Sequence, residues 1–170
     1  LISNWLIENN FSAPSIYIKD KAHGLLLLED FGITKFSIIL KRNKNKKLYY
    51  YKKAIDALID LSKQKPPSFL KPYDKKTYVK ELNLFLVWHL NYKDNNEGVY
   101  EWHAIWKNLL KKIDKNHISL VLRDYHVDNI FYLKKRKKIK DIGLIDYQDA
   151  LIGHPSYDLV SLLQDVRTFI

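Results

Sequence analysis

The chain has 170 residues, of which 46% are hydrophobic and 28% charged, enough for one globular domain with a core of its own. It contains no Cys, which excludes disulfides and thiolate metal sites and favours a reducing compartment, here expected to be the cytoplasm. No apolar run approaches the roughly 18 residues of a membrane-spanning helix, and the net charge of +10 comes largely from lysines spread along the chain, which argues against a nucleic-acid-binding stripe and for a solvated basic surface.

The first part of the chain predicts a helix, a β-hairpin and a bend. Apolar side chains at helical spacing over residues 2–10 predict the end of a helix. Two short apolar runs, residues 15–19 and 24–29, predict strands joined by a turn. Gly32 follows the second run, where a Gly marks a bend, and we expect the boundary between two lobes there.

The middle of the chain predicts mainly helices. Apolar side chains recur at steps of three and four over residues 48–62, and a second helical pattern covers 78–92 after a Pro-rich loop. The clearest stripe follows, between Val99 and Ile113. It contains Trp102 and Trp106, which we expect to lie in the core.

The last third predicts three short strands and a helix. The strands are the apolar runs 118–122, 130–133 and 142–145, and Pro155 stands near the first turn of the final helix. Strands and helices that are segregated along the chain favour an α+β architecture. The chain contains no Met and stops inside an apolar helical pattern, so we expect a fragment of a longer protein, cut at both ends.

The link KKRKKIK between the last two strands suits the solvated tip of a hairpin. If the hairpin turns in the middle of this link, opposing residues have numbers that sum to about 275. Ile130 then faces Ile145, and Asn129 faces Asp146 at the open end of the hairpin. The sequence therefore predicts that an amide and a carboxylate meet there.

Asp124 lies five residues before Asn129, on the loop that leads to the same end of the hairpin. Two carboxylates and an amide form a cluster of hard oxygen ligands, which suits Mg²⁺. If Asn129 and Asp146 bind the metal, Asp124 is left free to accept a proton from a hydroxyl group. The alternative for each residue taken singly is a turn-capping role.

An Asp-x-x-x-x-Asn loop followed by a hairpin and a second Asp resembles the catalytic arrangement of protein kinases. In detail, RDYHVDN (residues 123–129) and IDYQDALIGHPSYDL (residues 145–159) are similar to the aminoglycoside phosphotransferase family. Within that family, the chain most resembles the bacterial kinases that phosphorylate N-acetylmuramate or N-acetylglucosamine at the anomeric hydroxyl. The resemblance implies a protein-kinase-like fold, with residues 1–31 as the end of the N-terminal lobe and the hinge, and 32–170 as a C-terminal catalytic lobe truncated at its end.

The resemblance also implies roles for single residues and two cofactors, ATP and Mg²⁺. Asp124 would be the catalytic base, and Asn129 and Asp146 the metal ligands. Asp158 would brace the catalytic loop through hydrogen bonds, and His126 is expected to support the same loop. The segment LLLLEDFG resembles the nucleotide hinge, so backbone groups at the end of this segment would hold the adenine, namely those of Glu29, Asp30 and Phe31.

One part of the family's machinery is missing from the sequence. The chain has neither a Gly-rich phosphate loop nor a strand Lys followed by a helix Glu, and we expect these parts before Leu1. The fragment alone would then bind ATP poorly and be inactive.

The acceptor is the least determined part of the interpretation. Glu81, Phe85 and Trp88 share one helical face and would suit a sugar, although a core stripe with a peripheral Glu is the alternative. We expect an amino-sugar kinase. The alternatives are a kinase of another small alcohol such as an aminoglycoside or a choline-like molecule, a pseudokinase scaffold, and a nucleic-acid-binding protein; the oligomeric state stays open.

Overall fold

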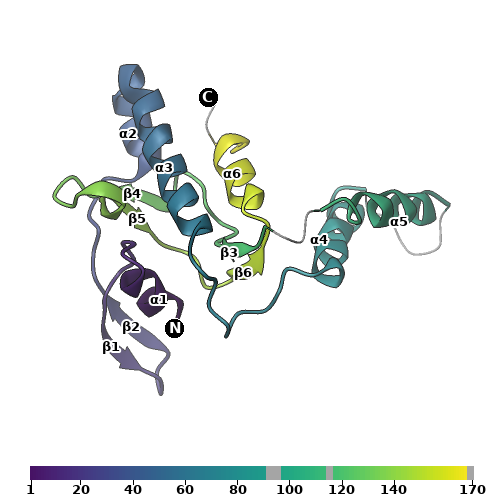
Figure 1. Cartoon of the computed structure of the whole chain (residues 1–170), viewed down its shortest axis with the longest axis horizontal. Coiled ribbons are helices and arrows are strands. Elements are labelled where there is room, and N and C mark those ends of the chain that lie inside the picture. Colours follow the sequence, from purple (N-terminus) through teal and green to yellow (C-terminus); the bar gives the residue numbers. More distant parts are fainter. Residues whose placement is uncertain (91–96, 114–116, 168–170) are drawn as a thin grey trace.

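The computed structural model describes residues 1–90, 97–113 and 117–167 (Figure 1). Helix α1 (Ile2–Glu8) comes first, and β1 (Ile16–Asp20) and β2 (Leu25–Leu28) then form an antiparallel hairpin. These elements agree with the sequence-based prediction. None of the helices within the described ranges is long and apolar enough to cross a membrane.

The next helices include one that the sequence did not predict. Helix α2 (Phe36–Arg42) buries three apolar side chains, and a short 3-10 helix (Lys44–Lys46) connects it to the predicted helix α3 (Lys47–Ser62). Four of the first five residues of α2 are apolar, so the run shows no helical spacing, and the basic residues that follow it read as a loop. Burial of Phe36, which is fully inaccessible to solvent, is what stabilises this short helix.

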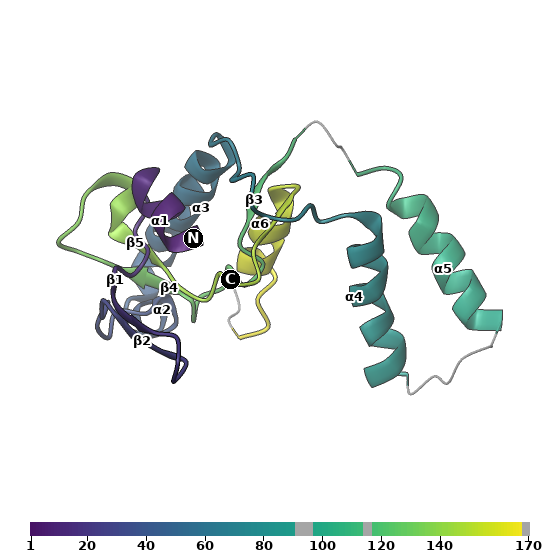
Figure 2. The ribbon, with the colours of Figure 1, turned by 90° about the horizontal axis from the view of Figure 1, so that it is seen from below.

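Helices α4 (Lys75–Trp88) and α5 (Glu97–Leu109) form a pair that stands to one side of the other elements in both views (Figures 1 and 2). Helix α4 begins three residues before the predicted position. The reason is its cap, because the carboxylate of Asp74 accepts hydrogen bonds from the backbone N–H and the hydroxyl of Thr77, each at 2.8 Å. The predicted end of this helix, residues 91–92, lies outside the described residues.

The prediction that Trp102 and Trp106 lie in the core was wrong. Helix α5 has no buried residue, and both indoles are half-buried on the side of α5 that faces α4. Trp102 stacks on Phe85 of α4 with the ring centroids 5.2 Å apart. The apolar stripe of α5 therefore pairs with its neighbouring helix instead of with the main body.

Two small antiparallel sheets lie beneath α3. Strand β4 (Ile130–Tyr132) pairs with β5 (Ile142–Leu144), as predicted, but Ile130 faces Leu144, one residue away from the expected partner. The shift arises because the link contains a 3-10 helix (Lys138–Asp141) instead of a symmetric turn. Strand β3 (Ser119–Val121) pairs with β6 (Leu151–Gly153), which the sequence did not predict.

The core sits between these sheets and helices α1, α2, α3 and α6 (Ser156–Leu163). Helix α3 contacts β3, β5 and α6, and so joins elements that are far apart in the sequence (Figure 1). The segment after α3 also returns to this region, because Lys71 and Tyr73 exchange backbone hydrogen bonds with Ile152 of β6 at 2.9 and 2.7 Å. Residues 71–73 therefore run alongside β6.

Gly143 is required by a close approach between the hairpin and the segment after β2. A Cβ at this position would lie 2.8 Å from two ring carbons of Phe31 and 3.0 Å from Leu133. We predict that Gly143→Ala lowers the free energy of unfolding by about 1–3 kcal/mol, measured by urea denaturation, because the ring must move. The same change in a Phe31→Ala background should cost less; an equal cost in both backgrounds would contradict this explanation.

Candidate active site

The loop between β3 and β4 alternates buried and accessible side chains. Tyr125 and Val127 are buried, and the Tyr125 hydroxyl donates a hydrogen bond to the carbonyl oxygen of Ala54 in α3 at 2.8 Å. Two tight turns fold the loop, because His126 N–H donates to the carbonyl oxygen of Asp124 and Asn129 N–H to that of His126. The buried positions thus anchor the loop, and the polar side chains between them stay at the surface.

Asn129 and Asp146 lie together at the mouth of the β4–β5 hairpin, as the sequence predicted. The Asn129 Nδ2 lies 3.1 Å from Asp146 Oδ2 and 3.1 Å from the carbonyl oxygen of Asp124. The backbone continues the contact, since Ile145 N–H donates to the carbonyl oxygen of Asn129 at 3.2 Å. One amide group therefore connects the hairpin carboxylate to the backbone of Asp124.

Asp146 adopts a backbone conformation that is uncommon for a residue with a side chain. Its φ is 62°, in the left-handed region that Asp and Asn tolerate better than most residues. Gln148 Nε2 donates to Asp146 Oδ1 at 2.8 Å, so each carboxylate oxygen has one hydrogen bond. Such outliers concentrate at ligand-binding positions, where the surrounding structure holds them in place.

The pair of Asn129 and Asp146 fits a magnesium ion better than a transition metal. Asn129 uses its N–H groups for the contacts above, which leaves its Oδ1 as a ligand atom, and Asp146 offers a carboxylate. Within the described residues no three His, Asp or Glu side chains gather to hold a metal by themselves. Mg²⁺ needs only one or two carboxylates when phosphate and water supply the other oxygens.

His126 lies beside the same amide. Its Nε2 is 3.2 Å from Asn129 Nδ2, the atom whose two hydrogens face the carbonyl oxygen of Asp124 and Asp146 Oδ2. The Nδ1 atom is buried and has no hydrogen-bond partner among the residues that the structure describes. The histidine ring thus lies against the Asn129 amide and limits its orientation.

Asp158 of α6 holds the start of the loop from inside the protein. It is 1% exposed, and its two oxygens accept hydrogen bonds from the backbone N–H groups of Leu122 at 2.7 Å and Arg123 at 2.8 Å. Burial raises the pKa of Asp158 to about 7, and the Asp124 carboxylate adds to the rise, against the lowering effect of the two N–H donors. Arg123 has a φ of 73°, and this pair of hydrogen bonds stabilises that conformation.

Glu29, Asp30 and Phe31 meet the tip of the β4–β5 hairpin. Glu29 accepts hydrogen bonds from the backbone N–H and hydroxyl of Ser15, each at 3.2 Å, and forms an ion pair with Arg136. The Arg136 guanidinium also lies 5.3 Å from the centroid of the Phe31 ring. A cavity of about 340 Å³ lies at this junction. The basic run 134–140 predicts a solvated hairpin tip, so the sequence did not predict that Arg136 contacts Glu29 and Phe31.

Glu81, Phe85 and Trp88 do not gather at one place. Glu81 reaches the loop between β3 and β4, where Arg123 Nη2 lies 2.5 Å from its carboxylate. The Phe85 ring is stacked against Trp102 of α5, and Trp88 is 83% exposed. The structure therefore brings only Glu81 to the neighbourhood of Asp124.

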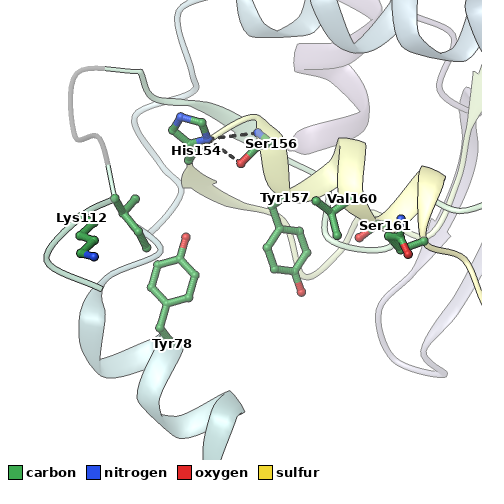
Figure 3. A pocket seen from close by; sticks show the side chains of 9 residues that line it. Tyr78, Lys112, His154, Ser156, Tyr157, Val160 and Ser161 are labelled. Atoms are coloured by element: carbon green, nitrogen blue, oxygen red, sulfur yellow. Dashed lines mark hydrogen bonds between the residues drawn. The ribbon is translucent and has the colours of Figure 1, made fainter. Parts of the chain in front are cut away.

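A further cavity, of about 720 Å³, lies between the start of α4 and α6 (Figure 3). Figure 3 shows Tyr78 of α4 and Tyr157 of α6 on its opposite walls, with Lys112 and His154 at one end. None of Asp124, Asn129 and Asp146 lines it. No local pattern predicted this cavity, because its walls come from segments that are distant in the chain.

A model of the phosphotransferase enzyme family matches residues 9–169. The chain belongs to this family. The match confirms the resemblance that the motifs at 123–129 and 145–159 predicted. The matched range includes the loop between β3 and β4, both hairpin strands and residues 29–31.

Two kinases of known name are similar to this chain over most of its length. The chain is 29% identical to an N-acetylmuramate/N-acetylglucosamine kinase of Caulobacter vibrioides, over 97% of this chain and 48% of the relative. It is 30% identical to the kinase of the same name from Neisseria meningitidis, over 91% of this chain and 46% of the relative. The chain thus spans about half the length of these relatives.

Solved structures confirm the α+β, protein-kinase-like fold. The streptomycin–ATP–APH(2")-IIa ternary complex superposes with a TM-score of 0.61 at 17% identity, over 95% of this chain and 57% of that one. The choline kinase LicA from Streptococcus pneumoniae gives 0.58 at 17% identity, over 95% of this chain and 53% of that one. At these identities the similarity concerns the fold alone.

The buried carboxylate of Asp158 gives a pH prediction. The unfolded chain releases this proton near 3.8 and the folded protein near 7, so the folded state binds more protons in between, and stability falls as pH rises across that interval. We predict that the difference in unfolding free energy between wild type and Asp158→Asn shrinks from about pH 4 to about pH 7 and is level above. Urea denaturation at several pH values measures it; parallel stability curves would contradict it.

Proposed function

We propose that the protein carrying this chain transfers the γ-phosphoryl group of ATP to a hydroxyl group of an amino sugar, with Mg²⁺ as cofactor. The observation that supports this most is the contact of Asn129 with Asp146 and with the backbone of Asp124. These contacts hold the two proposed metal ligands together and next to the backbone of the proposed base. Phosphoryl transfer needs such positioning and charge stabilisation more than covalent chemistry.

Each residue of this region has one role in the proposal. Asp124 accepts the proton of the acceptor hydroxyl as the hydroxyl oxygen attacks the γ-phosphorus in line, while the bond from the γ-phosphorus to the β,γ-bridging oxygen breaks and ADP leaves. Asn129 and Asp146 hold Mg²⁺, which supplies the charge that neutralises the phosphate oxygens. His126 and Asp158 keep the loop in place, through Asn129 and through the backbone before Asp124 respectively.

Residues 1–31 form the end of an N-terminal lobe with the nucleotide hinge, and residues 32–170 form the catalytic lobe. Backbone groups of Glu29, Asp30 and Phe31 bind the adenine at the junction with the hairpin tip. The ion pair between Glu29 and Arg136 supports this assignment, because it fixes the segment after β2 against the catalytic lobe. Two of the similar structures are nucleotide complexes, one with ATP and one with AMP, and they support a nucleotide as the donor.

The acceptor is assigned from the two named kinases. Both share about 30% of their residues with this chain over more than nine-tenths of its length, whereas the aminoglycoside and choline kinases resemble it in fold at 17% identity. N-acetylmuramate and N-acetylglucosamine are therefore the first acceptors to test. The complete protein that contains these residues is the material for every activity assay.

Asp124→Asn tests the proposed base. We predict that turnover falls by about 10²–10⁴, because the amide cannot accept the hydroxyl proton, while the melting temperature and nucleotide affinity stay close to wild type. Asp128→Asn, four residues along the same loop, is the matched control and should keep its turnover. Near-wild-type turnover of Asp124→Asn would reject the base assignment.

Asp146→Asn tests the proposed metal site. Asn tolerates the left-handed backbone at this position, so the fold should persist while a charged ligand is lost. We predict that Mg²⁺ no longer strengthens ATP binding, measured by isothermal titration calorimetry with and without Mg²⁺. An unchanged effect of Mg²⁺ on ATP affinity in this variant would place the metal elsewhere.

A further inference from the structure

A cavity of about 540 Å³ lies beside the catalytic loop, between the first turns of α4 and residues 71–72. This volume is within the range of small-molecule sites, about 300–1,000 Å³. Three cationic side chains line it, Lys71, Lys80 and Arg123, together with the carboxylates of Asp74 and Glu81. The cavity therefore carries more positive than negative groups.

Both carboxylates of the cavity already have hydrogen-bond donors. Asp74 caps α4 by accepting two hydrogen bonds from Thr77, and Glu81 accepts from Arg123 and from the Tyr73 hydroxyl. By contrast, neither Lys71 nor Lys80 has an ion pair within the described part of the chain, and both are exposed. An anion that enters the cavity meets two unpaired ammonium groups.

Arg123 also has unused hydrogen-bonding capacity. Its Nη2 binds Glu81 at 2.5 Å, but its Nε is buried and has no partner among the described residues. A buried N–H without a partner is costly, and an anionic ligand would satisfy it. The half-buried guanidinium, positioned by Glu81, is thus prepared for one more acceptor.

Arg123 connects the cavity to the loop that carries the proposed base. Arg123 directly precedes Asp124, and its Nη1 is 3.4 Å from the carbonyl oxygen of Asp149, three residues after Asp146. One side chain that lines the cavity therefore spans from the proposed base to the segment after the proposed metal ligand. An acceptor whose hydroxyl reaches Asp124 can place a substituent in this cavity.

We propose that this cavity binds the carboxylate of an acidic amino-sugar acceptor and selects it over the neutral sugar. The inference rests on the proposed function. N-acetylmuramate differs from N-acetylglucosamine by a lactyl ether that carries a carboxylate, so the two sugars form a natural pair for testing it. Lys80 and Lys71 attract the carboxylate, and the Nε–H of Arg123 donates a hydrogen bond to it.

The experiment compares kcat/KM for the two sugars in the complete protein and in Lys80→Gln, Lys80→Glu and Lys75→Gln. Lys75 is exposed on the same helix and does not line the cavity, so Lys75→Gln is the matched control. The ratio of kcat/KM for N-acetylmuramate to that for N-acetylglucosamine should fall about threefold to tenfold in Lys80→Gln, mainly through KM, and further in Lys80→Glu. The control should keep the wild-type ratio, and higher ionic strength should lower that ratio in the wild type.

Three results would overturn the proposal, each in a different way. An unchanged ratio in both Lys80 variants would show that the cavity does not recognise the carboxylate. If the Lys80 variants have a higher KM for ATP than the wild type, with either sugar as acceptor, the cavity binds a nucleotide phosphate instead. If the wild-type protein phosphorylates neither sugar while it hydrolyses or binds Mg²⁺-ATP, the amino-sugar function fails, and this inference fails with it.

Discussion

The buried carboxylate of Asp158 is the constraint on which the geometry of the loop depends. It accepts the backbone N–H groups of Leu122 and Arg123 in a place with almost no access to solvent. A charged group is costly there unless it is hydrogen-bonded, and the backbone N–H groups would be costly there without an acceptor. Each side of the contact therefore needs the other, and the chain direction at Asp124 is determined by a helix that starts more than thirty residues later.

Arg123 lies between two proposed sites, the reaction centre at Asp124 and the acceptor cavity beside α4. Because its backbone is held in the left-handed region, its side chain leaves the loop toward α4, where Glu81 binds it. The next residue, Asp124, is the proposed base, which accepts the proton of the acceptor hydroxyl. A single turn of the loop thus serves the proposed chemistry on one side and the proposed acceptor cavity on the other.

The helix pair α4–α5 has a different relation to the rest of the chain. Its two helices pack on each other through Phe85 and Trp102. Glu81 joins α4 to the loop between β3 and β4 through its ion pair with Arg123. Charged contacts of this kind allow a substrate that also carries charge to compete for the same groups.

Local patterns in the sequence predicted the elements that bury a regular face. Strand β4, strand β5 and helix α3 were found from apolar runs and helical spacing, and the meeting of Asn129 with Asp146 followed from the hairpin alone. Helix α2 and strand β6 were missed, because the nearly continuous apolar run of α2 has no helical spacing and β6 has only two apolar side chains before Gly153. Their stability comes from burial against partners that no local pattern identifies.

The sequence by itself determined the family, the hairpin and the pair at its mouth, because these depend on residues that are close together in the chain. Only the tertiary structure decided that the stripe of α5 faces α4, that Arg136 reaches Glu29, and that Lys71, Lys80 and Arg123 share one cavity. These contacts join segments tens of residues apart. Their geometry depends on how α3 and Asp158 bring those segments together, and spacing along the chain carries no information on that.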